Sequence, residues 1–272
     1  MQLSIIISTY NSEALLYKVL LGYSIQNYTD FEVIIADDGS TDATKLVVAS
    51  FANAFRYPIK HVWQEDIGFR KCKILNKAIV ASEAAYLIFS DGDCIPRQDF
   101  VYQHYKRREK GYFLSGGYFK LTTVVTNSIT NKSIEVQECF NVFWLIKNGL
   151  KLNFRITKLI RNRFFSSFMN WVTPTKASWN GHNSSGFKED LVTINGFNEL
   201  LAYGGEDREL GERLSNLGLN SKQIRYSAVC IHLHHERKYV DEEKIKFNLK
   251  IRNFNKKNKI IKIDNGIRNL IE

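Results

Sequence analysis

The sequence lacks paired cysteines, a leader and long apolar runs. Its four cysteines lie far apart with no CxxC pair, so neither a disulfide framework nor zinc-finger spacing is present. No segment has the ~20 consecutive apolar residues of a membrane-spanning helix, and no basic leader precedes the first apolar run. We expect a cytoplasmic protein, soluble or peripheral on the inner face of the cell membrane.

Acidic residues are missing from one stretch. Residues 139–188 contain eight Lys or Arg and no Asp or Glu, in a chain of net charge +10. This excess indicates an anionic partner such as a nucleotide, a phosphate-bearing lipid, a membrane face or nucleic acid. Apolar residues at helical spacing within it predict a basic amphipathic helix over 151–168. Packing of its apolar stripe on the core is favoured over contact with a membrane surface.

The first hundred residues contain short apolar runs. They cover residues 3–8, 31–36, 59–63 and 86–89 and alternate with helical patterns. The pattern predicts an α/β fold with a mostly parallel, Rossmann-like sheet whose two faces are covered by helices. Farther along, it predicts strands within 112–123 and 224–233, a helix over 206–217 and a basic helix or tail over 236–272.

Polar residues follow the predicted strands. Ligands of open α/β sheets bind beyond the carboxyl ends of the strands, so these residues are where a site is expected. The three polar segments are Ser8-Thr9-Tyr10-Asn11, Asp37-Asp38-Gly39-Ser40 and Asp91-Gly92-Asp93.

The Asp91-Gly92-Asp93 triplet offers hard oxygen ligands in a sharp turn, which suits Mg²⁺ or Mn²⁺ bridging a diphosphate. Taken alone, the triplet is equally typical of an ordinary turn. Asp37 and Asp38 offer acceptors for a base or ribose, or else cap the next helix. Because acids at neighbouring strand ends repel one another, a cation between them is expected.

Together these segments resemble the nucleotide-sugar-binding half of family 2 glycosyltransferases of the GT-A fold. The resemblance implies that Asp37 or Asp38 contacts uracil and ribose, that Asp91 and Asp93 serve the ribose and the metal, and that a UDP-sugar is the donor. Thr9, Tyr10 and Asn11 fall in the first of these motifs.

The stretch from Glu65 to Asn76 also resembles the family. By that analogy Arg70 contacts a phosphate or base, although a solvated charge at a helix start is an equal interpretation.

The second half, in the stretches 187–199 and 204–207, is similar to the acceptor side of β-1,4-galactosyltransferases and chondroitin-type polymerases. The similarity implies that Asp207 is the general base and that Glu206 helps to hold a sugar. Gly204 and Gly205 would let a sugar approach the backbone, and both acids would start a helix whose dipole stabilises them. The lead Leu201-Ala202-Tyr203 departs from the family's aromatic pattern, which leaves sugar and acceptor open.

Three histidines occur within four residues at 232–235. On a strand, His232 and His234 share a face, and a turn would bring His235 to the same place. In the galactosyltransferases a Met and, three residues on, a His complete the metal shell. His235 and then His232 are therefore the predicted partners of Asp93 for Mn²⁺ or Mg²⁺.

The resemblance implies three segments: a nucleotide-sugar-binding half over 1–110, an acceptor-binding and catalytic half over 111–235 and a basic C-terminal part over 236–272. It also implies an inverting enzyme that transfers N-acetylgalactosamine, N-acetylglucosamine or galactose to a glycan or lipid-linked glycan in bacterial surface polysaccharide synthesis. Membrane contact would involve 151–168 or the basic C-terminus.

Two other functions are open. A sugar-nucleotide nucleotidyltransferase would use a similar sheet edge, but its Gly-rich, basic loop after the first strand is missing. A non-catalytic polyanion binder would use the basic stretch, but the acid pairs hinder it, and no nucleic acid is expected as a partner.

Overall fold

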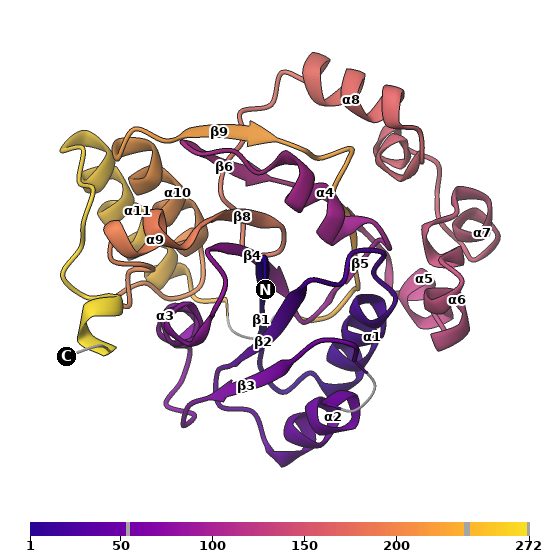
Figure 1. Ribbon diagram of the computed structural model, residues 1–272, viewed down its shortest axis with the longest axis horizontal. Coiled ribbons are helices and arrows are strands. Elements are labelled where there is room, and N and C mark those ends of the chain that lie inside the picture. Colours follow the sequence, from indigo (N-terminus) through magenta and orange to yellow (C-terminus); the bar gives the residue numbers. More distant parts are fainter. Residues whose placement is uncertain (53–54, 237–239, 271–272) are drawn as a thin grey trace.

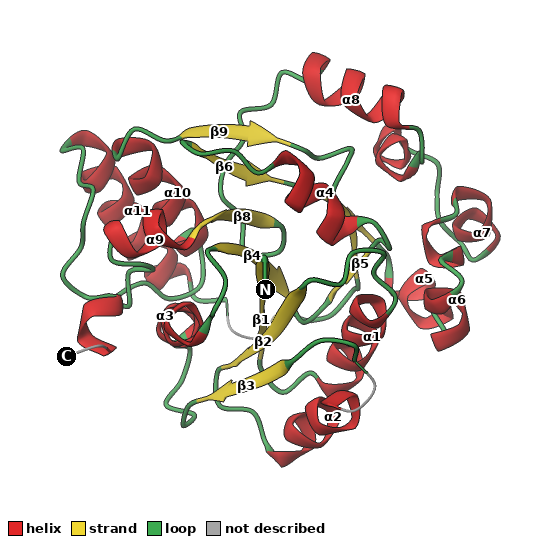
Figure 2. Ribbon diagram, in the orientation of Figure 1, coloured by secondary structure: helices red, strands yellow, loops and turns green. Residues whose placement is uncertain are grey.

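The computed structural model describes residues 1–52, 55–236 and 240–270. Its main sheet has the strand order β3-β2-β1-β4-β8-β6-β9 (Figures 1 and 2). The strands are β1 Leu3–Thr9, β2 Phe31–Asp37, β3 Ile59–Trp63, β4 Tyr86–Asp91, β6 Tyr112–Ser115, β8 Ser184–Phe187 and β9 Asn220–Gln223. β1 to β4 are parallel, whereas β8 runs antiparallel to β4 and β6. The predicted α/β fold with a mostly parallel sheet is confirmed, and one sheet continues across both expected halves.

Helices cover both faces of this sheet. The longer ones are α1 Glu13–Ser24, α2 Asp42–Ala52, α3 Lys71–Ala81, α4 Phe100–Arg107, α8 Arg163–Val172, α10 Glu206–Asn216 and α11 Glu242–Lys257. The shorter ones are α5 Thr123–Ser128, α6 Asn131–Glu135, η1 Glu138–Phe140, α7 Val142–Lys147, η2 Phe154–Leu159, α9 Lys188–Thr193 and η3 Ile267–Leu270.

Alternation along the strands builds two cores. Ile5 and Ile7 of β1 face a cluster that includes α1 and α2, whereas Ile6 faces a cluster that includes α3 and α10. All three side chains are fully buried. The apolar runs that predicted strands are therefore apolar because the sheet has no solvent-facing side here.

The parallel register brings the polar strand ends together. Ser8 lies beside Asp91, and Thr9 lies beside Asp37. The backbone N–H of Gly92 donates to the carbonyl of Ser8 at 2.8 Å, which fixes the turn after β4. A Cβ at Gly92 would lie 3.1 Å from that carbonyl, so the close approach favours glycine.

A second, small sheet carries the histidine segment. Its strands are β5 Cys94–Pro96, β10 Val229–His232 and β7 Gly117–Lys120, in the order β5-β10-β7. β10 pairs antiparallel with β5, and His232 lies opposite Cys94. The prediction of strands over 224–233 was too long, because the N–H groups of Ser227 and Ala228 both donate to the Ile224 carbonyl and form a turn.

The single helix predicted over 151–168 is wrong. Asn153 caps η2 by accepting from Arg155 N–H, and Asn162 caps α8 by accepting from Phe165 N–H, so the chain starts a helix twice. The apolar stripe is divided accordingly. Ile156 packs against the core, whereas Phe164 is 85% exposed.

Helices α5 to α8 form an arm along the outer edge of the molecule, away from α10 and α11 (Figure 1). Among the described helices, none combines the length and the apolar character needed to cross a bilayer.

Candidate active site

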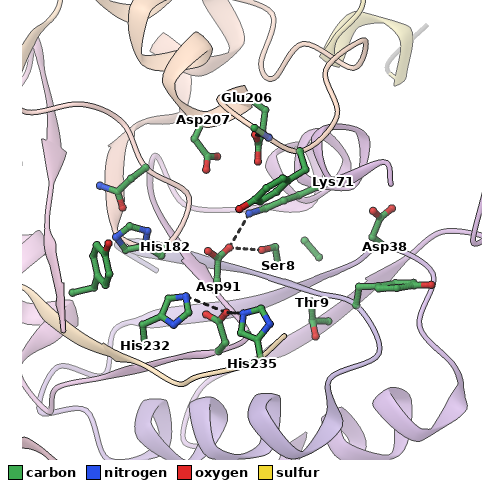
Figure 3. A pocket seen from close by; sticks show the side chains of 18 of the residues that line it. Ser8, Thr9, Asp38, Lys71, Asp91, His182, Glu206, Asp207, His232 and His235 are labelled. Atoms are coloured by element: carbon green, nitrogen blue, oxygen red, sulfur yellow. Dashed lines mark hydrogen bonds and ion pairs between the residues drawn. The ribbon is translucent and has the colours of Figure 1, made fainter. Parts of the chain in front are cut away.

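A cavity of about 1100 Å³ opens at the carboxyl ends of β1 and β4. Figure 3 shows its acids and bases: Glu206 and Asp207 come from the start of α10, and His232 and His235 lie on the opposite side of Asp91. Segments that are distant in sequence therefore meet in one hollow. The sequence-predicted residues that line it are Thr9, Tyr10, Asn11, Asp38, Asp91, Asp93, Gly204, Gly205, Glu206, Asp207, His232 and His235.

Asp91 lies at the centre of the cavity. Its Oδ1 accepts hydrogen bonds from Ser8 Oγ at 2.6 Å and from Lys71 Nζ at 2.9 Å. Burial opposes ionisation, but the Lys71 charge and the Ser8 hydroxyl outweigh it and lower the pKa of Asp91 well below its usual value. Asp91 is therefore a fixed negative charge.

Lys71 is a functional-site residue that the sequence analysis missed. It is the first residue of α3 and reaches across to β4. Burial alone lowers the pKa of its ammonium, but the charges of Asp91, Asp207 and Glu206 outweigh burial and raise the pKa well above its ordinary value. The cavity thus holds a permanent cation among three acids, which no local motif indicates.

Asp93 forms the second acidic position and faces two imidazoles. His235 Nε2 lies 2.7 Å and His232 Nε2 lies 3.5 Å from the same Asp93 Oδ2. Burial raises the pKa of Asp93, but the close contact with His235 leads the effects that lower it overall.

The His235 ring reveals what this cluster fits. Its Nδ1 lies 2.9 Å from the Glu236 carbonyl, which only accepts, so Nδ1 carries the hydrogen. A neutral ring then turns the Nε2 lone pair toward the Asp93 carboxylate, which is repulsive unless a proton or a metal ion lies between them. Metal-bound histidines are typically held this way, with the second nitrogen donating to a carbonyl.

Cys94 stands beside the same group. Ligand atoms of Asp93, Cys94 and His232 lie within 4.8 Å of one another. Burial raises the pKa of the Cys94 thiol well above its usual range, so the thiol stays protonated and its Sγ donates to Asp93 Oδ1 at 3.1 Å. Asp93 with His235 and His232 therefore fits a cation better than a set with Cys94.

Asp207 lies on the opposite wall. Gly204 and Gly205 have φ values of 114° and 99°, and they turn the chain into α10. The Asp207 Oδ1 is buried and, among the described residues, has no hydrogen-bond partner. Burial leads the effects that raise the pKa of Asp207 to about 7, the Glu206 and Asp91 charges add to it, and Lys71 opposes them.

Glu206 has a different arrangement from its neighbour. Its Oε2 accepts from the Gly204 N–H at 2.8 Å, so the side chain folds back and holds the glycine turn. This contact fixes the entry to α10 and the direction in which Asp207 points.

Asp38 occupies the outer end of the cavity. Its Oδ1 accepts from Gln64 Nε2 at 2.6 Å and its Oδ2 from the Arg70 N–H at 2.8 Å. Burial nevertheless raises the pKa of Asp38. Tyr10, half exposed, donates its hydroxyl to Asp66 Oδ2 at 2.9 Å on the same side.

Two predicted residues do not line the cavity. Asp37 is fully buried, accepts from the Ser40 N–H at 2.8 Å and lies 2.8 Å from His61 Nε2. Asp37 organises the turn after β2, which corresponds to the alternative that it caps the next helix. The Arg70 guanidinium donates to the Glu65 carbonyl, and only the Arg70 backbone serves Asp38.

His182 is a further residue that the sequence analysis missed. It lies in the loop before β8 and lines the cavity near Asp91 (Figure 3). Burial lowers the pKa of His182 to about 4, so the imidazole is neutral at pH 7. A lone histidine in a loop gave no signal.

Comparison with known proteins identifies this arrangement. The profile of glycosyl transferase family 2 matches residues 4–177, and that of the galactosyltransferase N-terminal domain matches residues 163–236. The chain belongs to glycosyl transferase family 2. The resemblance seen in the sequence is confirmed, in preference to the nucleotidyltransferase and polyanion-binder alternatives.

Family 2 relatives of this chain vary in length. It is 28% identical to the uncharacterized glycosyltransferase YfnE of Bacillus subtilis, over 92% of this chain and 69% of YfnE. It is 40% identical to validoxylamine A glucosyltransferase of Streptomyces hygroscopicus, over 36% of this chain and 22% of that protein. It is 27% identical to chondroitin synthase of Escherichia coli, over 82% of this chain and only 33% of the synthase.

Solved glycosyltransferases share the fold. Staphylococcus aureus TarS (1–349) in complex with UDP-GlcNAc matches with a TM-score of 0.64 and 17% identity, over 96% of this chain and 70% of that one. The mannosyltransferase PcManGT of Pyrobaculum calidifontis, in complex with GDP-Man and Mn²⁺, matches with a TM-score of 0.58 and 18% identity, over 88% and 58%. The GT-A fold is confirmed.

Proposed function

We propose that this chain is an inverting glycosyltransferase that moves a sugar from a UDP-sugar to a hydroxyl of a glycan or lipid-linked glycan. The observation that carries the proposal is the pair of opposed walls in one cavity. Asp207, whose pKa is about 7, stands on one wall, and Asp93 with His232 and His235 stands on the other. A proton acceptor and a cation site are two groups that assist glycosyl transfer from a nucleotide diphosphate to a hydroxyl.

The donor would lie along the strand ends. Thr9, Tyr10, Asn11 and Asp38 line the outer part of the cavity and would contact the uracil and ribose. Asp93, His235 and His232 would hold Mn²⁺ or Mg²⁺, which when bound supplies positive charge against the leaving diphosphate.

Lys71 adds a protein cation beside that position. Its ammonium is held by Asp91 at 2.9 Å and stays charged in the buried site, so it favours phosphate oxygens near the sheet edge. Because Ser8 also holds Asp91, the cation is fixed in place before substrate binds.

Asp207 would act on the acceptor. Its free, buried Oδ1 takes the proton of the acceptor hydroxyl, and the acceptor oxygen forms a bond to the anomeric carbon. The bond from that carbon to the diphosphate oxygen breaks at the same time, and UDP leaves with the electron pair. Attack from the side opposite the leaving group inverts the anomeric configuration. Glu206 and the two glycines shape the wall against which the sugar rests.

N-acetylgalactosamine, N-acetylglucosamine and galactose are the proposed sugars. The TarS complex contains UDP-GlcNAc, and chondroitin synthase is among the relatives, which supports a UDP-sugar and a polysaccharide product. Synthesis of a bacterial surface polysaccharide is the proposed setting.

Turnover with a panel of UDP-sugars and Mn²⁺ tests this proposal. We expect acceptor-dependent release of UDP from one of the three donors, and a product whose anomeric proton coupling shows inversion in nuclear magnetic resonance spectra. Retention of the donor configuration, or turnover of GDP-sugars only, would contradict the proposal.

We also propose peripheral contact with the inner face of the cell membrane. Phe143, Phe164 and Trp171 on the outer arm are 83%, 85% and 82% exposed, within the stretch that has eight basic residues and no acid. Exposed aromatic side chains beside basic ones suit an anionic bilayer surface. The basic helix α11, with Phe254 62% exposed, is the alternative contact.

Co-sedimentation with phosphatidylglycerol vesicles tests the membrane contact. The double change Phe164→Ser and Trp171→Ser should abolish binding, whereas Leu46→Ser with Val80→Ser, which removes exposed apolar side chains from α2 and α3, should not. If the α8 variant binds as well as the unaltered chain, the contact is made by α11 instead. If the unaltered chain does not bind the vesicles, the proposed membrane contact is refuted.

A further inference from the structure

A second cavity, of about 370 Å³, has five cationic residues and one acid in its lining. It lies beside α4 and the start of α8 and shares no lining residue with the candidate active site. The basic residues that line it are Arg97, Lys106, Arg107, Arg161 and Arg163. The acid among its lining residues is Asp99.

Asp99 is already committed to other partners. It accepts from Arg97 Nε at 2.6 Å and Arg97 Nη2 at 3.1 Å, and also from Gln103 Nε2 at 2.7 Å. Arg97 Nη2 further donates to the Ser227 carbonyl at 2.6 Å. The remaining nitrogen, Nη1 of this buried arginine, has no hydrogen-bond partner among the described residues. The Asp99 carboxylate is thus paired with Arg97, and Arg97 Nη1 can still donate a hydrogen bond to a ligand.

Two other arginines of the cavity, Arg107 and Arg161, have neutral partners. Arg107 donates to Gln103 Oε1, and Arg161 Nη2 donates to Gln137 Oε1 at 3.2 Å. Burial lowers the pKa of both guanidinium groups, with Arg97 adding to the effect and Asp99 opposing it. Arginine does not lose its proton in a protein, so a bound anion would relieve this repulsion.

The geometry points to a binding site for a phosphate group, as a monoester or a diphosphate. Guanidinium forks match phosphate oxygens, and Arg163, which lines the cavity, is the first residue of α8, where the helix dipole favours an anion. The volume exceeds that of a single phosphate, so the rest of a phosphorylated molecule has room. The site is separate from the nucleotide-sugar cavity and does not depend on the proposed transfer reaction.

A lipid headgroup and a soluble phosphate are two sources of the same chemistry. The cavity lies at the start of α8, whose Phe164, Phe168 and Trp171 are exposed. A bilayer against α8 would therefore bring headgroup phosphates to Arg161 and Arg163.

Titration calorimetry with inorganic phosphate and with pyrophosphate tests the site, in a buffer that contains a chelator, so that no metal ion holds either probe in the nucleotide-sugar cavity. The double change Arg107→Gln and Arg161→Gln should weaken binding about tenfold or more, because charge-assisted contacts are lost. The control, Lys151→Gln with Arg155→Gln, removes the same charge from exposed positions that do not line the cavity and should change affinity less than about twofold.

Absence of binding to both probes at millimolar concentration would overturn the proposal, as would equal weakening in the two double variants. If the cavity variant fails to fold, the unaltered chain still decides. Pyrophosphate must then raise Tm above that in sodium chloride of equal ionic strength, and an equal Tm would refute the site.

Vesicles of phosphatidylcholine with and without phosphatidic acid separate the sources. If the site is a headgroup site, the cavity variant loses the phosphatidic acid dependence of sedimentation. If its ligand is soluble, the variant sediments like the control and loses only the pyrophosphate heat. If the cavity variant keeps both the phosphatidic acid dependence and the heat of pyrophosphate binding, the proposed site is contradicted.

Discussion

Asp91 and Asp207 are two partly buried carboxylates in one cavity with opposite pKa shifts. Asp91 has an ammonium at 2.9 Å and a hydroxyl at 2.6 Å, and its pKa is lowered. Asp207 has an oxygen with no hydrogen-bond partner among the described residues, and its pKa is raised to about 7. Burial is the largest effect on both. The difference shows that partners decide which acid is a fixed charge and which is a base.

Removal of the base should have the largest effect. Asp207→Asn should lower kcat about 10²- to 10⁴-fold, because the acceptor hydroxyl loses its proton acceptor, while UDP binding stays unchanged. Steady-state kinetics and calorimetry measure the two quantities. Equal activity of the two proteins would remove Asp207 from the mechanism.

Stability gives a control for that variant. The folded pKa of Asp207, about 7, lies above its unfolded value near 4, so ionisation in the fold costs stability as pH rises from about 4 to about 7. At pH 8, Asp207→Asn should therefore melt no lower than the unaltered chain.

The pH profile of the unaltered enzyme comes next. The base must be ionised, so kcat/KM should rise with pH through about 7 and level off above it. From the plateau to pH 5, two units below that pKa, it should fall about 100-fold. A profile that is flat from pH 5 to 8 would mean that Asp207 is ionised throughout or is not the base.

Lys71 tests the difference between the two acids. Lys71→Met removes the charge that lowers the pKa of both Asp91 and Asp207, so the acid limb of the profile should move to higher pH. Each unit of that shift costs about tenfold in kcat/KM at pH 6. Lys71→Arg should restore the limb. Lys73→Met, on the same helix but outside the cavity, should leave it in place.

Glu206 should give the smallest effect, in the opposite direction. Glu206→Gln keeps an oxygen to accept from the Gly204 N–H but removes a charge that raises the pKa of Asp207. The acid limb should move to lower pH by less than about one unit, with a few-fold gain in kcat/KM at pH 6. A shift to higher pH would show that the charge of Glu206 does not act on Asp207.

The strand ends were predictable because each motif follows its own strand. Asp91 and Asp93 flank Gly92 in the turn after β4, and parallel register places Asp91 beside Ser8 of β1. Asp37 and Asp38 show the limit of this reasoning. The two residues are adjacent in the sequence. The sequence does not reveal that Asp37 contacts Ser40 and His61, whereas Asp38 faces the cavity.

Contacts between distant segments were not predictable. Lys71 reaches Asp91 from a different helix, and His182 arrives from the loop before β8. The raised pKa of Asp207 depends on burial and on the charges of Asp91, which raises it, and of Lys71, which lowers it, and only the fold brings these distant residues to Asp207. The helix over 151–168 failed for a local reason, because capping by Asn153 and Asn162 outweighed the apolar periodicity.

Binding of UDP with and without Mn²⁺, measured by calorimetry, tests the central claim most directly. The unaltered chain and Asp207→Asn should bind UDP tightly only with Mn²⁺, whereas Asp93→Ala should lose the dependence on metal. Failure of UDP to bind the unaltered chain with either Mn²⁺ or Mg²⁺, or an unchanged metal dependence in Asp93→Ala, would contradict the claim.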